Sequence, residues 1–372
     1  MRQRFLGWDE KGTRFTQQRP GNFPHLMLRE YRLRWMVFFV LLGALAGGCG
    51  LPTPERDNAS RSAPAGDSSN SPLAPGQFRR IVSMAPSITE TLFALGCGDR
   101  VVAVTDFCEY PPEVRNLPRV GGYVNPNLEA VLRLRPDLVV APAGAEDLPA
   151  KLKAMGLPVL TVDHRSIEGV FDSLSILGKA LGVERRAEEL RATWRKRLDT
   201  IAQRCRGQPR PRVLVVVDRP LETGRLQNLC AAGSDGFLNR LVELAGGENV
   251  LGDSAVAFPI ISAETVLRLN PDVIIEIQAG REISSERHSE WLAAWQEVKE
   301  VSAVQNGRVY LLGKDVPVVP GPRMLDLAES LGRCIHPELF DVTTSSRAGP
   351  ADGKGLSAVI TRRVLAAGPQ FL

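Results

Sequence analysis

The chain lacks the short motifs that mark the common enzyme classes. Its 372 residues contain no GxSxG elbow, no P-loop and no GxGxxG after a strand, the arrangements that build a nucleophile or hold a nucleotide. The pair Gly246-Gly247 is better explained as the end of a helix. Histidine is scarce, and only His164, His288 and His336 lie outside the leader described below. A bare zinc or manganese site needs about three histidines and a carboxylate together, so the sequence indicates neither an enzyme nor a bare-metal binder.

Cysteine is also used sparingly, and no two cysteines form a CxxC pair. A zinc or thiol-redox motif is therefore unsupported. Besides Cys49, discussed next, the chain holds Cys97, Cys108, Cys205, Cys230 and Cys334. In an oxidising compartment one or two disulfides could form among these five, and the odd number leaves at least one thiol free.

No apolar run is long enough to span a bilayer, which takes about 20 residues. The run Met36 to Ala46 has instead the length of a signal-peptide core, and arginines precede it. It leads into Leu45-Ala46-Gly47-Gly48-Cys49, which resembles a bacterial lipobox although the usual pattern has Leu in place of Ala46. The resemblance implies cleavage before Cys49 and lipidation of its thiol, so that residues 1–48 are a lipoprotein signal peptide. An ordinary signal peptide or an uncleaved anchor is the alternative, and Met27 would be a more usual start.

Removal of the leader changes the charge of the protein. Residues 1–48 hold eight Lys/Arg and three Asp/Glu, so the net charge falls from +4 to about −1. The mature chain therefore shows no basic patch that would indicate nucleic-acid binding. After Cys49, residues up to 77 are rich in Pro, Ser and Gly, which predicts a disordered tether with a reach of about 30 Å. Residues 341–372 are predicted to be a weakly ordered tail.

An internal repeat organises the body of the chain. Residues 127–140 read NLEAVLRLRPDLVV and residues 262–275 read SAETVLRLNPDVII, with seven of fourteen positions identical. Each copy has apolar residues at helical spacing, then Pro-Asp, which stops a helix, and then a β-branched run. This predicts one helix-turn-strand unit used in two similarly built α/β lobes, and a cleft between lobes is a preferred place for a small-molecule site.

The periodicity predicts the elements of both lobes. Strands are expected at 80–84, 101–105, 138–141 and 159–162 in an N-terminal lobe (residues 78–165), and at 213–217, 273–277 and 309–312 in a C-terminal lobe (residues 206–340). Alternation of strands and helices predicts parallel sheets covered on both faces. A helix from about Ile88 would begin with Ser87 as its N-cap and Glu90 completing a capping box. A last helix is expected near 323–334.

Between the lobes, residues 166–205 have a helical pattern with a weak point at Gly182. The charged and apolar residues of 183–205 predict one amphipathic helix of about 35 Å at 1.5 Å per residue. A helix of this length can bridge two lobes. A coiled coil is the alternative, but the segment offers only three irregular heptads.

These segments together resemble the helical-backbone substrate-binding proteins of ABC importers. The resemblance covers about residues 79–340 and includes RIVSMAPSITETLFALGCGDRVVAVTDFCEYPPE, FLNRLVELAGGENV and GPRMLDLAESLGRCIHPELF. The cobalamin-binding subgroup is the most similar, and ferric-siderophore and haem binders are related. The resemblance implies a monomer with two α/β lobes joined by a rigid helix, a ligand held in the cleft without a resident cofactor, and delivery to a membrane permease dimer with its ATPase. It further implies an extracytoplasmic location.

In this family a carboxylate on each lobe docks on arginines of the permease. The matching residue of the second lobe is Glu264. For the first lobe we favour Glu146, which follows a predicted strand, whereas the repeat superposes Glu129 on Glu264, so both stay open. A helix N-terminal acid stabilised by the macrodipole is the alternative for each.

Ligand contacts are expected in loops at the carboxyl ends of the strands. The candidates are Ser87, Phe107, Tyr110, Tyr123, Arg219, Phe258 and Asp315. Phe258 matches an aromatic contact of the cobalamin binder, which suits a large and nearly neutral macrocycle. Pro142 replaces another aromatic of that binder. Siderophore binders favour arginines for anionic ligands, but Val319 and Pro320 occupy the loop before Gly321. A surface lipoprotein without a small ligand is the remaining alternative.

Overall fold

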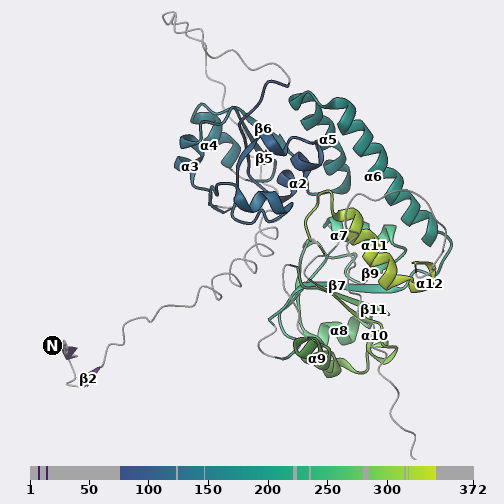
Figure 1. Cartoon of the computed structure of the whole chain (residues 1–372). Coiled ribbons are helices and arrows are strands. Elements are labelled where there is room, and N and C mark those ends of the chain that lie inside the picture. Colours follow the sequence, from purple (N-terminus) through teal and green to yellow (C-terminus); the bar gives the residue numbers. More distant parts are fainter. Residues whose placement is uncertain are drawn as a thin grey trace, which may run out of the picture.

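The computed structural model describes residues 76–122, 125–145, 147–220, 224–233, 236–279, 285–313, 316 and 318–340, and earlier in the chain only β1 (Gly7–Trp8) and β2 (Arg14–Phe15), which pair with each other. Cys49, the tether and the tail lie outside these residues, so their assignments stay predictions. The described body consists of two α/β lobes, with one long helix along the side of both (Figure 1).

The N-terminal lobe has a four-stranded sheet with the order β4-β3-β5-β6, and all its strands are parallel. This confirms the four predicted strands and their direction. The elements are β3 (Ile81–Ser83), α2 (Pro86–Ala94), η1 (Gly98–Arg100), β4 (Val101–Val104), η2 (Pro112–Asn116), α3 (Leu128–Arg133), β5 (Leu138–Pro142), α4 (Leu148–Ala154) and β6 (Val159–Val162).

The start of α2 differs from the prediction. The helix begins at Pro86, its N-cap is Ala85, and no side chain caps it. Proline fits the first helical position because its fixed φ is helical and its missing N–H would be unpaired there. The predicted capping box of Ser87 and Glu90 was therefore wrong, and Glu90 is free to make a different contact, described below.

The C-terminal lobe has a mixed sheet with the order β10-β8-β7-β11-β12, in which β9 also pairs with β7. β7, β11 and β12 are parallel, as predicted, whereas β8 is antiparallel to β7 and to β10. The elements are β7 (Arg212–Asp218), β8 (Leu229–Ala231), α7 (Phe237–Leu244), β9 (Glu248–Asn249), β10 (Ile260–Ile261), α8 (Ala263–Leu269), β11 (Val273–Ile277), α9 (Ser285–Ala294), η3 (Trp295–Val298), α10 (Ser302–Gln305), β12 (Val309–Leu312), α11 (Met324–Ile335) and α12 (Pro337–Phe340).

The sequence repeat is also a repeat of hydrogen bonds. In the first copy the Asp137 carboxylate accepts backbone N–H groups of Arg79 (2.7 Å) and Arg80 (2.9 Å), at the start of the neighbouring strand. In the second copy Asp272 accepts the backbone N–H of Arg212 at 2.8 Å. In both copies the arginine side chain donates back to carbonyl oxygens at the end of the preceding helix. Pro-Asp therefore stops the helix and ties the amino ends of two parallel strands together.

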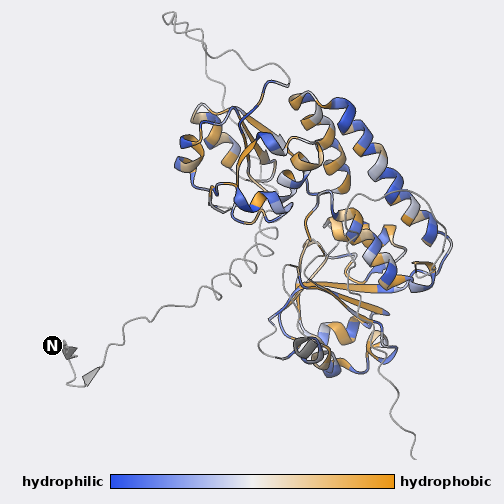
Figure 2. Ribbon diagram, viewed as in Figure 1, coloured by the Kyte–Doolittle hydropathy of each residue, from blue (hydrophilic) through white to orange (hydrophobic). Residues whose placement is uncertain are grey.

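The linking segment forms two helices, α5 (Ile167–Leu181) and α6 (Glu184–Cys205). Ser166 caps α5 by accepting the N–H of Gly169, and α5 ends at Gly182, whose φ of 69° is left-handed and favours glycine. The expected long helix is confirmed in α6. Its outer face is polar and its inner face contributes Trp194, Leu198 and Ile201 to the core (Figure 2).

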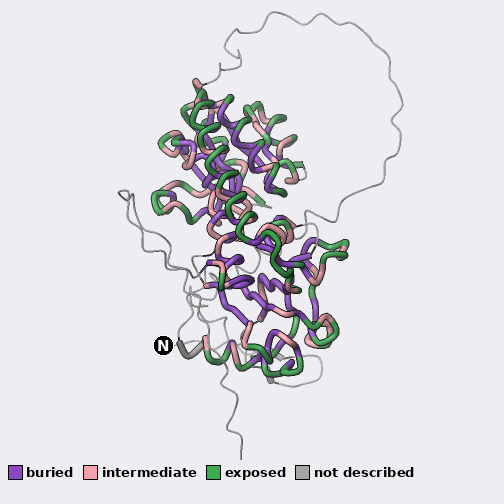
Figure 3. Tube along the Cα trace, turned by 90° about the vertical axis from the view of Figure 1, so that its right-hand side faces the viewer, coloured by how far each residue is buried: buried purple, intermediate pink, exposed green. Residues whose placement is uncertain are grey.

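The strands alternate their side chains between two cores, which is why each sheet has two covered faces. In β7, Val213, Val215 and Val217 join an apolar cluster that includes α2, α5, α6 and α11, while Leu214 and Val216 join a separate cluster of the C-terminal lobe. The first cluster is continuous from one lobe to the other, and the buried positions follow it through the body (Figure 3). The junction of the lobes is thus an apolar interior.

The five cysteines of the body are free and buried. Burial raises the pKa of these thiols, and that of Cys230 reaches about 12. None of the disulfides considered from the sequence is formed. Within the described ranges, no helix has both the length and the apolarity that a bilayer crossing requires.

Candidate ligand-binding site

The loops at the carboxyl ends of the strands meet where the two lobes join. Ser87 lies at the start of α2, four residues after the end of β3, and is 7% exposed. The C-terminal lobe covers it, because a β-carbon at Gly321 would stand only 3.5 Å from the Ser87 Cα. The Pro320–Pro322 turn before α11 thus packs on the first turn of α2.

An ion pair crosses the same junction. Arg323, the N-cap residue of α11, donates from Nε and Nη2 to the two carboxylate oxygens of Glu90, at 3.1 and 2.6 Å. The Glu90 side chain is 2% exposed and that of Arg323 20%. Burial raises the pKa of the Glu90 carboxyl, and the bond from Arg323 acts in the opposite direction. The two lobes are therefore joined by a charge-assisted, bidentate contact in a largely desolvated place.

Tyr110 completes this junction. The Arg323 guanidinium carbon lies 4.3 Å from the centre of the Tyr110 ring, close enough for a cation–π contact. Tyr110 is 40% exposed and follows β4 in the N-terminal lobe. The structure thus brings two predicted ligand residues, Ser87 and Tyr110, to one place and adds Glu90 and Arg323. No local pattern predicts that these last two would meet, because 233 positions separate them.

The two predicted phenylalanines lie in different environments. Phe107 is half-buried in the loop after β4, beside Gly122. Phe258 precedes β10, is 7% exposed, and lies 3.6 Å from the position of a β-carbon on Gly236. Phe258 belongs to the apolar cluster shared by the lobes. An aromatic face in this position can line a cleft only where the neighbouring loops leave it accessible.

The structure gives Arg219 a role other than the expected ligand contact. It directly follows β7, is 1% exposed, and its Nε lies 3.0 Å from both carboxylate oxygens of Glu276 on β11. Glu276 also accepts from Gln278 at 2.6 Å and from the Trp295 indole at 3.2 Å. The guanidinium is thus fully engaged inside the C-terminal lobe, and the sequence offered no signal for its partner.

Three expected site residues, Tyr123, Asp315 and Glu146, lie outside the described residues. Of the docking carboxylates, Glu264 is exposed in the first turn of α8, where a hydrogen bond from Ser262 lowers the pKa of its carboxyl. Glu129 is exposed in the first turn of α3. Ser262 and Asn127 cap these two helices in the same way, each accepting a backbone N–H three residues on. Glu129 and Glu264 therefore hold equivalent positions in the two lobes.

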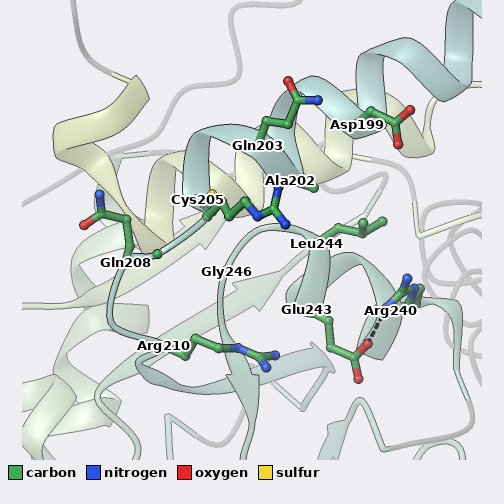
Figure 4. A pocket seen from close by; sticks show the side chains of 12 residues that line it. Asp199, Ala202, Gln203, Cys205, Gln208, Arg210, Arg240, Glu243, Leu244 and Gly246 are labelled. Atoms are coloured by element: carbon green, nitrogen blue, oxygen red, sulfur yellow. Dashed lines mark hydrogen bonds and ion pairs between the residues drawn. The ribbon is translucent and has the colours of Figure 1, made fainter.

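A surface hollow of about 620 Å³ lies at the other end of the C-terminal lobe (Figure 4). It lies between the end of α6 and α7, beside the chain that enters the amino end of β7. Its walls are Asp199, Ala202, Gln203, Cys205, Arg206, Gly207, Gln208, Arg210, Arg240, Glu243, Leu244 and Gly246. None of the predicted ligand residues lines it, so its size does not make it the ligand cleft.

Neither lobe presents a metal centre among the described residues, where no group of three His, Cys, Asp or Glu side chains could hold an ion. His164, which follows β6, is 6% exposed and neither ring nitrogen has a hydrogen-bond partner. Burial lowers its pKa to about 4. It is therefore a neutral interior histidine.

Two similar lobes, a bridging helix and a junction of loops at the strand ends form an arrangement suited to holding a ligand between the lobes. The chain belongs to the periplasmic binding protein family, whose model matches residues 81–316. It is 32% identical over 260 residues to the vitamin B12-binding protein of Vibrio cholerae, covering 69% of this chain and 89% of that one. It is 29% identical over 313 residues to the ABC transporter substrate-binding lipoprotein YvrC of Bacillus subtilis, covering 81% and 96%.

Solved structures agree in fold. A periplasmic haem-binding protein of Pseudomonas aeruginosa gives a TM-score of 0.60 at 27% identity, covering 70% of this chain and 93% of that one. The periplasmic vitamin B12-binding protein of Vibrio cholerae gives 0.59 at 28%, covering 69% and 96%. These relatives bind substrates for transport and are not enzymes. The predicted α/β fold and the predicted family are thus confirmed, and the protein is a substrate-binding component that works with the permease and ATPase of an ABC importer.

Proposed function

We propose that the protein captures a corrinoid, cobalamin or a close analogue, at the junction of its two lobes. The observation that carries the proposal is that three arginines near the strand ends are paired with carboxylates, whereas Arg119 donates to carbonyl oxygens, including those of Thr105 and Cys108. Arg219 is paired with Glu276 and Arg323 with Glu90. Arg165, after β6, is paired with Asp163 at 2.6 Å. The buried pairs of Arg219 and Arg323 offer no free charge to an anionic chelate, and the charge of Arg165 is only partly compensated in its exposed pair. A large, nearly neutral macrocycle needs mainly apolar and aromatic surface.

The similarity to vitamin B12-binding proteins supports the same ligand. Phe258, Phe107 and Tyr110 would supply the aromatic contacts. Ser87 lies beneath the turn at Gly321 and would reach the ligand only after that turn moves. Contacts from Tyr123 and Asp315 belong to the proposal as well. Arg219 would act indirectly, by holding the end of β7 in place.

Haem is the second candidate. A specific observation favours it, since Tyr110 is 40% exposed at the lobe junction, and a phenolate oxygen is a recognised ligand of haem iron. The likeness to a haem-binding structure is in keeping with this reading. A ferric siderophore is less well suited, because such ligands call for free arginines.

Docking on the permease would use one carboxylate from each lobe. Glu264 is the candidate of the C-terminal lobe, and for the N-terminal lobe the equivalence of α3 and α8 favours Glu129 over Glu146. Both Glu129 and Glu264 are exposed and stand at helix N-termini. Glu129 also lies 3.6 Å from Arg133, a contact that permease arginines would have to replace. We propose a monomer anchored to the extracytoplasmic face of a membrane through lipidated Cys49.

Calorimetric titration of residues 49–372, with Cys49→Ser, tests the ligand. Cyanocobalamin, haem and a ferric siderophore are titrated in parallel. We expect saturable one-to-one binding of cyanocobalamin that Phe258→Ala weakens at least tenfold. Phe93→Ala, a half-buried aromatic at the far end of α2, is the matched control and should bind as the parent does. If the protein binds haem but not cobalamin, and Tyr110→Phe loses the haem binding, haem would replace cobalamin as the proposed ligand.

A further inference from the structure

The positive charge of the body is concentrated in one short segment. Residues 195–212, the end of α6 and the turn into β7, contain seven Lys/Arg and one Asp. Residues 78–340 as a whole contain 32 Lys/Arg and 34 Asp/Glu, so the body outside this segment carries 25 and 33. Residues 195–212 thus carry a net charge of +6, and the rest of the body carries −8. Because the net charge of the mature chain is close to zero, no basic patch was expected from the sequence, and this segment was missed.

Most of these charges are exposed and have no carboxylate partner. The exposed members are Arg195, Lys196, Arg204, Arg206, Arg210 and Arg212, and we call them the basic rim. Among the described residues none of the six forms an ion pair, in contrast to Arg197, which lies 2.8 Å from Asp326 and 3.1 Å from Glu329.

The contacts that rim residues do make leave their charge in place. Arg210 and Arg212 donate to carbonyl oxygens, of Gly247 at 2.8 Å and of Asn270 at 3.3 Å. Arg204 lies over the ring of Phe340, with its guanidinium carbon 5.5 Å from the ring centre. These contacts fix the direction of long side chains without neutralising them, so the rim presents an oriented positive surface.

Arg204, Arg206, Arg210 and Arg212 lie at the opposite end of the lobe from the ligand junction. Arg195 and Lys196 extend the rim along α6, where the Arg195 guanidinium carbon lies 5.1 Å from the centre of the Phe171 ring. The rim leads into the amino end of β7, whereas the ligand loops follow the carboxyl ends of the strands. The hollow of Figure 4 opens in the rim, and Arg206, Arg210 and Arg240 form part of its wall. Its two carboxylates are Asp199 and Glu243, and Glu243 is already paired with Arg240 at 2.9 Å. An anion can therefore approach this end of the molecule while the ligand junction faces away from it.

We propose that the basic rim is a contact surface for an anionic phospholipid bilayer. The chain has no acidic segment of its own to cover it, since residues 341–372 hold four Lys/Arg and two Asp/Glu and residues 50–77 hold two and three. Lys and Arg near an anionic leaflet strengthen partitioning about fivefold each, and the attraction ends within about a Debye length. Such contact would place the amino end of β7 and the adjoining part of α6 against the leaflet. The proposal does not depend on which ligand is bound.

Vesicle co-sedimentation tests the proposal on residues 49–372 with Cys49→Ser, which carries no acyl chain. The sheets of the two lobes and the three apolar clusters all lie within residues 78–340. We expect binding to vesicles of phosphatidylcholine and phosphatidylglycerol in equal parts, weak binding to phosphatidylcholine alone, and loss of binding as salt is raised.

The decisive variant is Lys196→Gln, Arg204→Gln and Arg206→Gln together, which should lower the partition coefficient on the order of a hundredfold if all three reach the surface, and at least tenfold. The matched control removes the same charge from exposed residues elsewhere, with Lys151→Gln, Lys153→Gln and Arg185→Gln. Ligand titration and thermal unfolding should be unchanged in both variants.

Three results would overturn the proposal. They are equal binding to the two kinds of vesicle, equal loss in the variant and its control, and absence of binding at low salt. If the protein does not bind vesicles but is retained on immobilised polyglutamate, and the triple variant loses this retention, the rim would instead be a contact surface for an acidic protein.

Discussion

The ion pair between Glu90 and Arg323 should contribute measurably to stability, because it is both bidentate and desolvated. Removing one partner of a buried ion pair costs about 3–5 kcal/mol, since the other charge is left without compensation. With Arg323 one-fifth exposed, we expect the lower end for Arg323→Gln, about 3 kcal/mol. Glu90→Gln keeps an acceptor oxygen and should cost about 1–2 kcal/mol.

A double-mutant cycle in urea isolates the contact. The double variant should lose about 2–3 kcal/mol rather than the sum of the single losses, which corresponds to a coupling of about 2 kcal/mol. Arg165 and Asp163 form the matched control, because they also meet at 2.6 Å but with side chains 73% and 40% exposed. Their coupling should stay below about 1 kcal/mol.

The effect of pH gives an independent signature. The folded-state pKa of Glu90 is raised above its ordinary value, so this group favours the fold below that ordinary value and the benefit is lost as pH rises through the folded pKa. Removing Arg323 raises the pKa further. The decrease in unfolding free energy caused by Arg323→Gln should therefore become smaller as pH falls toward 4.5, the ordinary pKa of a glutamate. Additive single losses, or equal coupling in the exposed control pair, would refute the reasoning.

Three further predictions concern other charged groups. Arg219→Met should cost about 3–5 kcal/mol in urea unfolding, and adding Glu276→Met should recover much of this, because the second change removes the unpaired buried carboxylate. The pKa of His164 is about 4 in the folded protein against an ordinary 6.5. The free energy of unfolding should therefore keep the whole contribution of neutral His164 above pH 6.5 and lose roughly 3 kcal/mol of it as pH falls toward 4. In His164→Phe this dependence of the unfolding free energy on pH should disappear. Glu129→Arg and Glu264→Arg should leave cyanocobalamin binding intact but abolish stimulation of the cognate importer's ATPase in proteoliposomes, and normal stimulation in both variants would exclude them as docking residues.

Much of the fold could be predicted because it depends on local patterns. Pro-Asp stopped both repeated helices as expected, since proline cannot continue a helix and the aspartate finds backbone N–H groups across the sheet. The amphipathic pattern after Gly182 predicted α6 within one residue of its start. The antiparallel β8 and β10 were missed because strands of three and two residues give too little alternation to detect.

The candidate site was less predictable because its contacts join distant parts of the chain. Arg219 and Glu276 are 57 positions apart, and nothing around either residue signals the other. Ser87 was assigned to the ligand from its place after a strand, but the turn at Gly321 covers it. A prediction from sequence places residues on loops, whereas the partner of each charge decides which of them remains available to a ligand.

The contacts between the lobes restrict how the protein can respond to its ligand. A continuous apolar cluster runs from α2 through α5 and α6 to α11. Arg197 ties α6 to two carboxylates of α11, and Arg323 ties α11 to α2. A wide hinge motion would have to expose the apolar cluster and break these ion pairs, at a cost that ligand binding would have to offset. Loop movements at the strand ends require neither. We therefore expect that the ligand is admitted and sensed mainly by the loops around Tyr110 and Phe258, while the spacing between Glu129 and Glu264 stays nearly constant, so that the permease meets the same pair of carboxylates in the empty and the loaded protein.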